Sequence, residues 1–195
     1  MQVKFIAYPV RVLGPGKRIG IWTTGCNRRC PYCTSPSLWE FDDDLDVPVD
    51  NLIKQIESYK EENVVDGITI SGGEPFLQKD LIVLLKKLRG LQIDDILVYT
   101  GYLLKEIKQE FDNYEEYLKN IDVLIDGPYV DDLNDGKNLR GSSNQNVIVF
   151  NEKLKAKYDS YLKEKREYQI KQLNDMETLL IGLPYKDAFK EVKRK

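Results

Sequence analysis

All three cysteines of the 195-residue chain lie in one short stretch, at Cys26, Cys30 and Cys33. This spacing, CxxxCxxC, places three thiolates on one tight loop. The chain has no fourth cysteine and no histidine, so no further ligand of these types can complete a four-ligand site. Structural zinc sites take four Cys or His ligands, and an ordinary iron–sulfur cluster takes four thiolates. The stretch therefore predicts a [4Fe–4S] cluster in which one iron is left for a ligand that is not protein.

Other uses of the three cysteines remain as alternatives to a cluster. Zinc could be held by the thiolates and a carboxylate, or the cysteines could be inert and buried. An odd number of cysteines at such short spacing is a poor disulfide framework. The opening residues, MQVKFIAYP, are too short for a signal peptide and are interrupted by Pro9. Thiols without an export signal indicate a reducing compartment, and we expect a cytoplasmic location.

The sequence SGGEP at residues 71–75 is the second candidate site. It follows a short apolar run that is typical of a buried strand. Gly72 and Gly73 would let backbone groups approach a ligand without obstruction by a Cβ atom. The carboxylate of Glu74 can accept hydrogen bonds from an ammonium group. A plain turn at the end of a strand is the alternative.

The cysteine motif and the GGE motif, in this order, resemble those of the radical S-adenosylmethionine (SAM) superfamily. The resemblance implies that Cys26, Cys30 and Cys33 bind the cluster and that SAM occupies the open iron. It also implies that Gly72, Gly73 and Glu74 hold the amine of SAM. Tyr32, the aromatic residue before the last cysteine, would lie near the adenine, and packing within the loop is its alternative role.

A narrower resemblance covers about residues 12–150. It rests on GPG at 14–16, SP at 35–36, LW at 38–39, VYTGY at 98–102, DVLIDGPY at 122–129 and RGSSNQ at 140–145. Together these resemble the activating proteins of the anaerobic (class III) ribonucleotide reductases. The resemblance implies an activase that removes a Cα hydrogen from a glycine of a glycyl radical enzyme. A flavodoxin or ferredoxin would supply the electron for each SAM cleaved.

Four further residues are candidates for binding SAM. Thr100 is expected to face the ribose. Asp126 could bind a ribose hydroxyl or a cation, or cap the turn that follows its strand. Arg140 and Ser142 could face an anion such as the SAM carboxylate, or belong to a loop network of backbone hydrogen bonds.

Apolar patterning predicts alternating strands and helices, hence an α/β fold. Strands separated by helices imply right-handed crossovers and a parallel sheet. About six such units predict a partial (β/α)6 barrel, with its chemistry at the carboxyl ends of the strands. Strands are expected over residues 18–24, 67–71, 96–100, 122–126 and 147–150, and helices over 49–59, 81–88 and 103–119.

The sequence predicts a core over residues 1–150 and an extension over residues 151–195 that packs on it within one domain. We expect the extension to contain a helix over 152–167, a β-hairpin formed by 168–172 and 176–181, and a short basic helix over 185–195. It could act as a lid on the open barrel or as a surface that docks a partner.

Composition excludes several classes of function. Charged residues make up 31% of the chain and nearly balance at a net charge of −3, so we expect no nucleic-acid partner. No apolar run approaches the roughly 20 residues needed to span a bilayer. The absence of histidine excludes a Ser–His triad. Besides an activase, the sequence leaves open a compact radical SAM enzyme that acts on a small molecule, and a non-enzymatic iron–sulfur or zinc interaction module.

Overall fold

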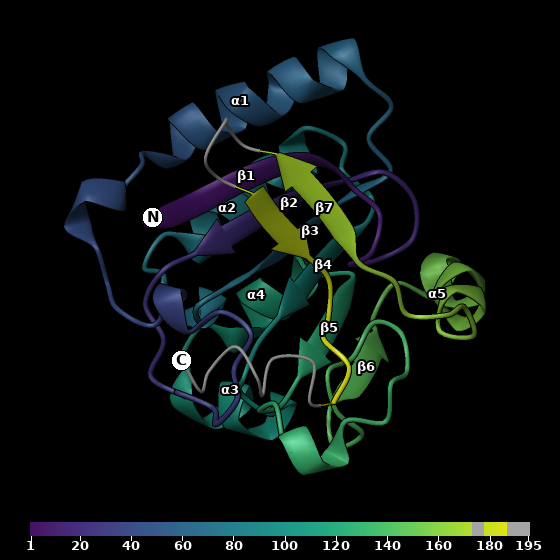
Figure 1. Cartoon of the computed structure of the whole chain (residues 1–195). Coiled ribbons are helices and arrows are strands. Elements are labelled where there is room, and N and C mark those ends of the chain that lie inside the picture. Colours follow the sequence, from purple (N-terminus) through teal and green to yellow (C-terminus); the bar gives the residue numbers. More distant parts are fainter. Residues whose placement is uncertain (173–177, 187–195) are drawn as a thin grey trace.

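The computed structural model describes residues 1–172 and 178–186. Its main sheet has six strands that lie side by side in chain order (Figure 1). Strands β2 to β5 are parallel, while β1 and β6 pair antiparallel at the two edges. The α/β partial barrel is therefore confirmed. The strands are β1 (Val3–Val10), β2 (Arg18–Thr23), β3 (Gly67–Gly72), β4 (Ile96–Tyr99), β5 (Val123–Asp126) and β6 (Asn146–Val149).

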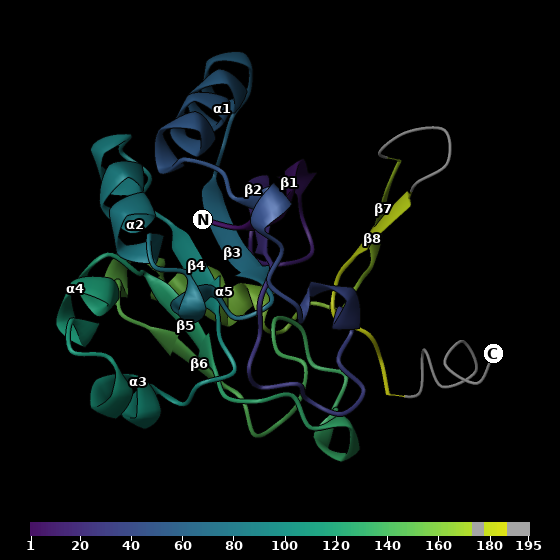
Figure 2. The same ribbon diagram turned by 90° about the vertical axis from the view of Figure 1, so that its left-hand side faces the viewer.

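Helices connect the parallel strands, as parallel pairing requires. Helix α1 (Val49–Glu62) joins β2 to β3, and α2 (Leu81–Gly90) joins β3 to β4. The helix expected over residues 103–119 is divided into α3 (Leu104–Glu110) and α4 (Tyr114–Lys119). Figure 2 shows these four helices on one side of the sheet. Short 3-10 helices cover Pro36–Leu38, Asp43–Leu45, Pro75–Leu77, Asp131–Leu133 and Glu152–Leu154.

The two edge strands run antiparallel to their neighbours, whereas sequence analysis expected a parallel sheet. Residues 11–17 join β1 to β2, and a connection this short cannot form a crossover to a parallel neighbour. Residues 127–145 join β5 to β6 and contain only a 3-10 turn, so β6 also returns antiparallel. Sequence analysis assigned no strand to residues 3–10, where Pro9 interrupts the pattern; proline is tolerated there because β1 is an edge strand.

Alternation along the parallel strands separates two layers of core. In β2, Ile19 and Ile21 face the helices, while Trp22 faces the inside of the open barrel. In β4, Ile96 and Val98 likewise join the helix-facing core, and Leu97 faces inward. Both faces of the parallel strands are thus buried, which explains their nearly continuous apolar sequences.

The extension contributes to the inner core. Helix α5 (Lys155–Tyr161) is shorter than the helix expected over 152–167, and it buries Tyr158 and Tyr161 against the inner face of β4 and β5. The predicted hairpin is confirmed as β7 (Gln169–Gln172) paired with β8 (Thr178–Ile181). Its turn, and most of the helix expected over 185–195, lie outside the described residues. The division at residue 150 stays a prediction.

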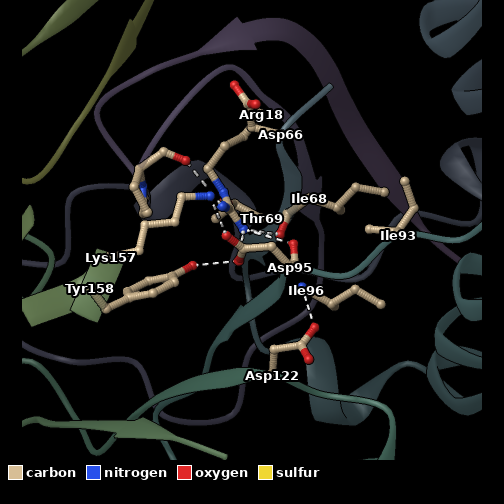
Figure 3. A network of polar contacts seen from close by, with 12 residues as sticks. Arg18, Asp66, Ile68, Thr69, Ile93, Asp95, Ile96, Asp122, Lys157 and Tyr158 are labelled. Carbon is tan, nitrogen blue, oxygen red and sulfur yellow. Dashed lines mark hydrogen bonds and ion pairs between the residues drawn. The ribbon is translucent and has the colours of Figure 1, made fainter. Parts of the chain in front are cut away.

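A buried polar network lies at the amino-terminal end of the parallel strands (Figure 3). Arg18, at the start of β2, donates from Nη2 to the Asp95 carboxylate at 3.0 Å and from Nε to Thr69 Oγ1 at 2.7 Å. Asp95 also accepts from Tyr158 Oη at 2.6 Å and from Lys157 Nζ at 3.0 Å. Two residues of α5 are thereby joined to the strands of the sheet. In the part of the chain that the model describes, no helix has the length and apolar character needed to cross a membrane.

Candidate functional site

The loop with the three cysteines begins where β2 ends, at the carboxyl edge of the sheet. Its start is fixed by backbone hydrogen bonds, from Gly25 N to Leu38 O at 2.9 Å and from Cys26 N to Trp39 O at 2.8 Å. The loop then turns back on itself, with Cys33 N donating to Cys30 O at 3.1 Å. All three cysteines are partly buried and line the same pocket. The structure thus brings the predicted cluster ligands together.

The SGGEP motif lies against the start of this loop. Gly73 N donates to Thr23 O and Glu74 N donates to Gly25 O, both at 2.8 Å. A Cβ atom on Gly73 would lie 2.4 Å from Gly25 O, and one on Gly72 would lie 2.3 Å from Thr23 N. Both glycines are therefore required for close approach of two backbone segments, a reason that differs from the expected approach of a ligand. Both still line the pocket, and their predicted contact with SAM stays a prediction.

Glu74 and Thr100 meet in the wall of the pocket. The Glu74 carboxylate accepts from Thr100 Oγ1 at 2.8 Å, from Gly101 N at 2.7 Å and from Phe76 N at 3.1 Å. Its side chain is almost fully buried, and burial raises the pKa of Glu74 to about 7, although these hydrogen bonds oppose the shift. A buried carboxylate at a pocket is well placed to bind a cationic group, since the cation would replace lost hydration.

Two thiols of the loop, Cys26 and Cys30, hold their protons more strongly than an exposed cysteine. Burial raises the pKa of Cys26 and of Cys30, and backbone N–H groups oppose the shift at Cys26. Because metal binding requires the thiolate, iron must displace these protons. Arg28 supplies a positive charge in the same pocket, and its guanidinium lies 4.7 Å from the ring centre of Tyr102.

Two other predicted residues have roles that hold the backbone. Asp126 is buried and accepts from Leu104 N at 2.7 Å and from Asn146 Nδ2 at 2.7 Å, so it caps α3 and fixes β6. Ser142 is also buried and accepts from Val130 N at 3.1 Å. The Ser142 contact fits the loop network given as its alternative, whereas Asp126 holds the starts of α3 and β6 and not the turn that follows its own strand. A contact of either residue with SAM stays a prediction.

Arg140 and Tyr32 are not among the residues that line the pocket. Arg140 forms an ion pair of 2.5 Å with Asp135 and lines a different cavity. The side chain of Tyr32 is 53% exposed. A contact of either residue with SAM stays a prediction.

Several pocket residues were missed by sequence analysis. Gln145 lies in the RGSSNQ motif, and its Oε1 accepts from Gly141 N at 2.8 Å while its Nε2 donates to Gly127 O. Arg28 lies within the cysteine motif itself, and Gly101 directly follows Thr100. Their position inside or beside a quoted motif was the available signal. Nothing in their residue types alone distinguished them from loop residues.

The donor set fits an iron–sulfur cluster better than a single ion. Within the described residues, no three His, Cys, Asp or Glu side chains are placed to hold one metal ion. A single zinc requires its sulfurs within about 2.3 Å of one point, whereas a cubane cluster binds each thiolate at a different iron. Three thiols around one pocket, without a fourth cysteine in the sequence, therefore suit a cluster with an open iron.

Comparison with known proteins agrees with this donor set. A family model described as "4Fe-4S single cluster domain" matches residues 12–148. The anaerobic ribonucleoside-triphosphate reductase-activating protein of Enterobacteria phage T4 is 33% identical over 141 residues, which cover 70% of this chain and 86% of that protein. The Escherichia coli K12 protein of the same name is 32% identical over 149 residues, covering 72% of this chain and 94% of the relative.

A second group of relatives has a different target in its name. The pyruvate formate-lyase-activating enzyme of Staphylococcus epidermidis is 31% identical over 146 residues, which cover 72% of this chain and 58% of that enzyme. The matched region contains the cysteine loop, the GGE motif and the strands that carry them. The chain therefore belongs to the single-cluster 4Fe–4S family of radical SAM enzymes that activate glycyl radical enzymes.

Proposed function

We propose that this chain activates an anaerobic ribonucleotide reductase by forming a glycyl radical on it. The observation that carries the proposal is the convergence of three thiols, Glu74 and Thr100 on one pocket at the carboxyl edge of the parallel strands. A [4Fe–4S] cluster bound there would supply the electron for reductive cleavage of SAM, and the products after hydrogen-atom transfer from a glycine Cα would be methionine, 5′-deoxyadenosine and a glycyl radical.

The residues of the pocket divide this work. Cys26, Cys30 and Cys33 hold the cluster. Glu74 accepts hydrogen bonds from the amine of SAM, and its three existing donors keep the carboxylate oriented toward the pocket. Thr100 orients Glu74 in addition to facing the ribose. Asp126 holds the start of α3, Ser142 holds Val130 beside the pocket residue Tyr129, and we assign both a positioning role.

The reductase is favoured over pyruvate formate-lyase by the extent of the matches. The alignment covers 94% of the Escherichia coli reductase-activating protein but 58% of the Staphylococcus epidermidis formate-lyase activator. The part of the larger activator that has no counterpart here could carry its own recognition of substrate. A flavodoxin or ferredoxin as electron donor, and a cytoplasmic location, complete the proposal.

Anaerobic reconstitution tests the proposal in two steps. With SAM and dithionite, the wild-type protein should form 5′-deoxyadenosine and methionine. After addition of a candidate reductase, electron paramagnetic resonance should detect a glycyl radical. The variant Cys30→Ala should lose the absorbance of the cluster, and its rate of SAM cleavage should fall at least 100-fold. The reason is that a cluster held by only two thiolates is not retained.

A matched control comes from a residue that contacts the cysteine loop from outside it. Glu40 has a side chain that is 76% exposed and pairs with Arg29. Glu40→Gln should keep cluster content and cleavage within twofold of wild type. SAM cleavage that persists in Cys30→Ala would overturn the ligand assignment. Cleavage without a glycyl radical on any reductase would instead overturn the proposed substrate.

A further inference from the structure

A second cavity adjoins the cluster pocket on the side of the C-terminal extension. The two cavities share the lining residues Thr34, Ser71, Tyr99, Leu183 and Pro184, so they adjoin each other, and we refer to the two together as the channel. The second cavity has a volume of about 250 Å³. The cluster pocket measures about 140 Å³ on the same scale, so the second cavity extends the available space toward the extension.

Residues 180–184 of the extension form the outer wall of this channel. Figure 2 shows the β7–β8 hairpin on the side of the sheet opposite to α1 and α2. Leu180 and Leu183 line the channel, and Ile181 between them is buried with Leu13 and Trp22 of the inner core. The family match ends at residue 148, so this wall is built from residues outside the matched region.

The wall is held at both ends. At the hairpin, the Gln169 side chain accepts from Arg11 N at 3.0 Å and donates to Pro9 O at 2.5 Å beside β1. At the other end, Pro184 O accepts from Arg166 Nη1 at 2.7 Å and from Asn134 Nδ2 at 2.8 Å. The Arg166 guanidinium is buried, so this contact is shielded from water. The channel wall is therefore preformed.

The lining of the second cavity is uncharged. Among the described residues that line it, none is Asp, Glu, Lys or Arg. Its polar groups include the hydroxyls of Thr34, Ser35 and Ser71, which can pair with peptide N–H and C=O groups. A carboxylate or phosphate would need a cationic partner to leave water, whereas a glycine-containing peptide segment would not.

From these observations we infer that residues 180–184 form the wall of a channel that admits an uncharged, extended peptide segment of a protein substrate to the cluster pocket. The inference rests on the proposed function and extends it to the part of the chain beyond the family match. A glycine segment fits because it presents its Cα–H bonds without a side chain. The extension then contributes to substrate specificity in addition to covering the barrel.

A charge placed on the wall tests this inference. Leu180→Glu introduces a carboxylate at a channel residue that is 46% exposed, so the fold should tolerate it. The matched control is Ile170→Glu, because Ile170 lies directly opposite Leu180 in the hairpin, is 73% exposed and is not among the lining residues. The probe is a fluorescein-labelled peptide with the glycine loop of a candidate anaerobic reductase. Its binding to the reconstituted, SAM-loaded protein is measured by fluorescence anisotropy.

The expected result is that Leu180→Glu weakens peptide binding at least tenfold, while Ile170→Glu binds within twofold of wild type. Both variants should keep wild-type melting temperatures and SAM cleavage without the peptide. No peptide binding by the wild type, or equal weakening by both variants, would overturn the inference. Glycyl radical formation is measured separately on the same samples. Peptide binding that depends on Leu180 but yields no radical would support the channel and contradict the proposed function.

Discussion

Glu74 combines two properties that oppose each other, burial and a charge needed for binding. Its carboxylate is 1% exposed and accepts three hydrogen bonds, two of them from backbone N–H groups. Burial nevertheless raises its pKa to about 7. Without a ligand, the carboxyl is therefore about half ionised near neutral pH. A cation that binds beside it would favour the ionised form.

This pKa predicts how SAM binding depends on pH. In the wild type, binding should strengthen as the pH rises from 6.0 to 7.5, because the ionised carboxylate accepts hydrogen bonds from the amine of SAM more strongly than the neutral carboxyl does. Glu74→Gln should weaken binding roughly 10- to 100-fold, the equivalent of the ~1.5–3 kcal/mol of a charged hydrogen bond. The variant should also lose the pH dependence. Isothermal titration calorimetry with the reconstituted protein measures both effects.

The control for this prediction is Glu110→Gln, since Glu110 is an exposed carboxylate at the end of α3. It should bind SAM as the wild type does at every pH. A Glu74→Gln protein with wild-type affinity and pH profile would show that the amine of SAM is bound elsewhere.

Residues whose chemistry is local could be predicted from the sequence, and those that depend on distant contacts could not. The three cysteines and Glu74 lie together in the pocket because each follows a strand at the same edge. Asp126 and Ser142 also have polar side chains and lie in the motifs on which the family resemblance rests. Their side chains, however, accept hydrogen bonds from residues distant in sequence, such as Leu104 and Val130. Sequence alone cannot distinguish a side chain that faces a ligand from one that holds a turn.

At the scale of elements, the site depends on how two loops are joined. The turn after β3 donates two hydrogen bonds to the end of β2 and the start of the cysteine loop, from Gly73 N to Thr23 O and from Glu74 N to Gly25 O. Gly73 leaves no space for a side chain between Gly25 O and Leu38 O. Any group added there separates the GGE motif from the cysteines. The spacing between the cysteine loop and the GGE motif is thus set by backbone packing.

Gly73→Ala should therefore reduce cluster binding although it changes no ligand. Its Cβ would lie 2.4 Å from Gly25 O and 2.8 Å from Leu38 O, and both atoms are backbone. We expect a loss of about 1–3 kcal/mol in the free energy of unfolding, with lower iron content after reconstitution. Gly90→Ala is the control, since a Cβ there meets no atom within 4 Å. Gly90→Ala should leave iron content unchanged; equal iron loss in both variants would contradict the packing argument.

The order of the parallel strands and their helices could be predicted from the local apolar pattern, whereas the antiparallel pairing at the edges of the sheet could not. Apolar runs located β2 to β5 and their helices, because both faces of these strands are buried. The direction of β6 depends on the path of residues 127–145, which contain no α-helix. The 3-10 turn at Asp131–Leu133 is stabilised by contacts such as Ser143 N to Leu133 O at 2.7 Å, which no periodicity predicts.

For the whole molecule, the network around Asp95 links the sheet to the extension. Burial would raise the pKa of Asp95, but the charge of Arg18 and hydrogen bonds from Arg18, Tyr158 and Lys157 outweigh it and lower the pKa below its ordinary value. Arg18 has no exposed surface, so its charge depends on this partner. Because Tyr158 belongs to α5, the same carboxylate holds the extension to the base of the barrel (Figure 3).

Asp95→Asn should destabilise the core and the extension together. The substitution leaves Arg18 as a buried charge without its counterion, which costs about 3–5 kcal/mol in the free energy of unfolding at pH 7. Because the folded-state pKa of Asp95 lies below its unfolded value, its contribution is complete above pH 4 and is lost as the pH falls through the folded-state pKa. The difference in the free energy of unfolding between wild type and variant should therefore stay constant from pH 5 to 8 and narrow below pH 4.

Urea unfolding, monitored by circular dichroism, measures this difference. The control is Asp94→Asn, since Asp94 is the neighbouring residue and is exposed. If Asp94→Asn costs as much, or if the difference persists unchanged at pH 3, the charge on Asp95 is not what joins the extension to the sheet.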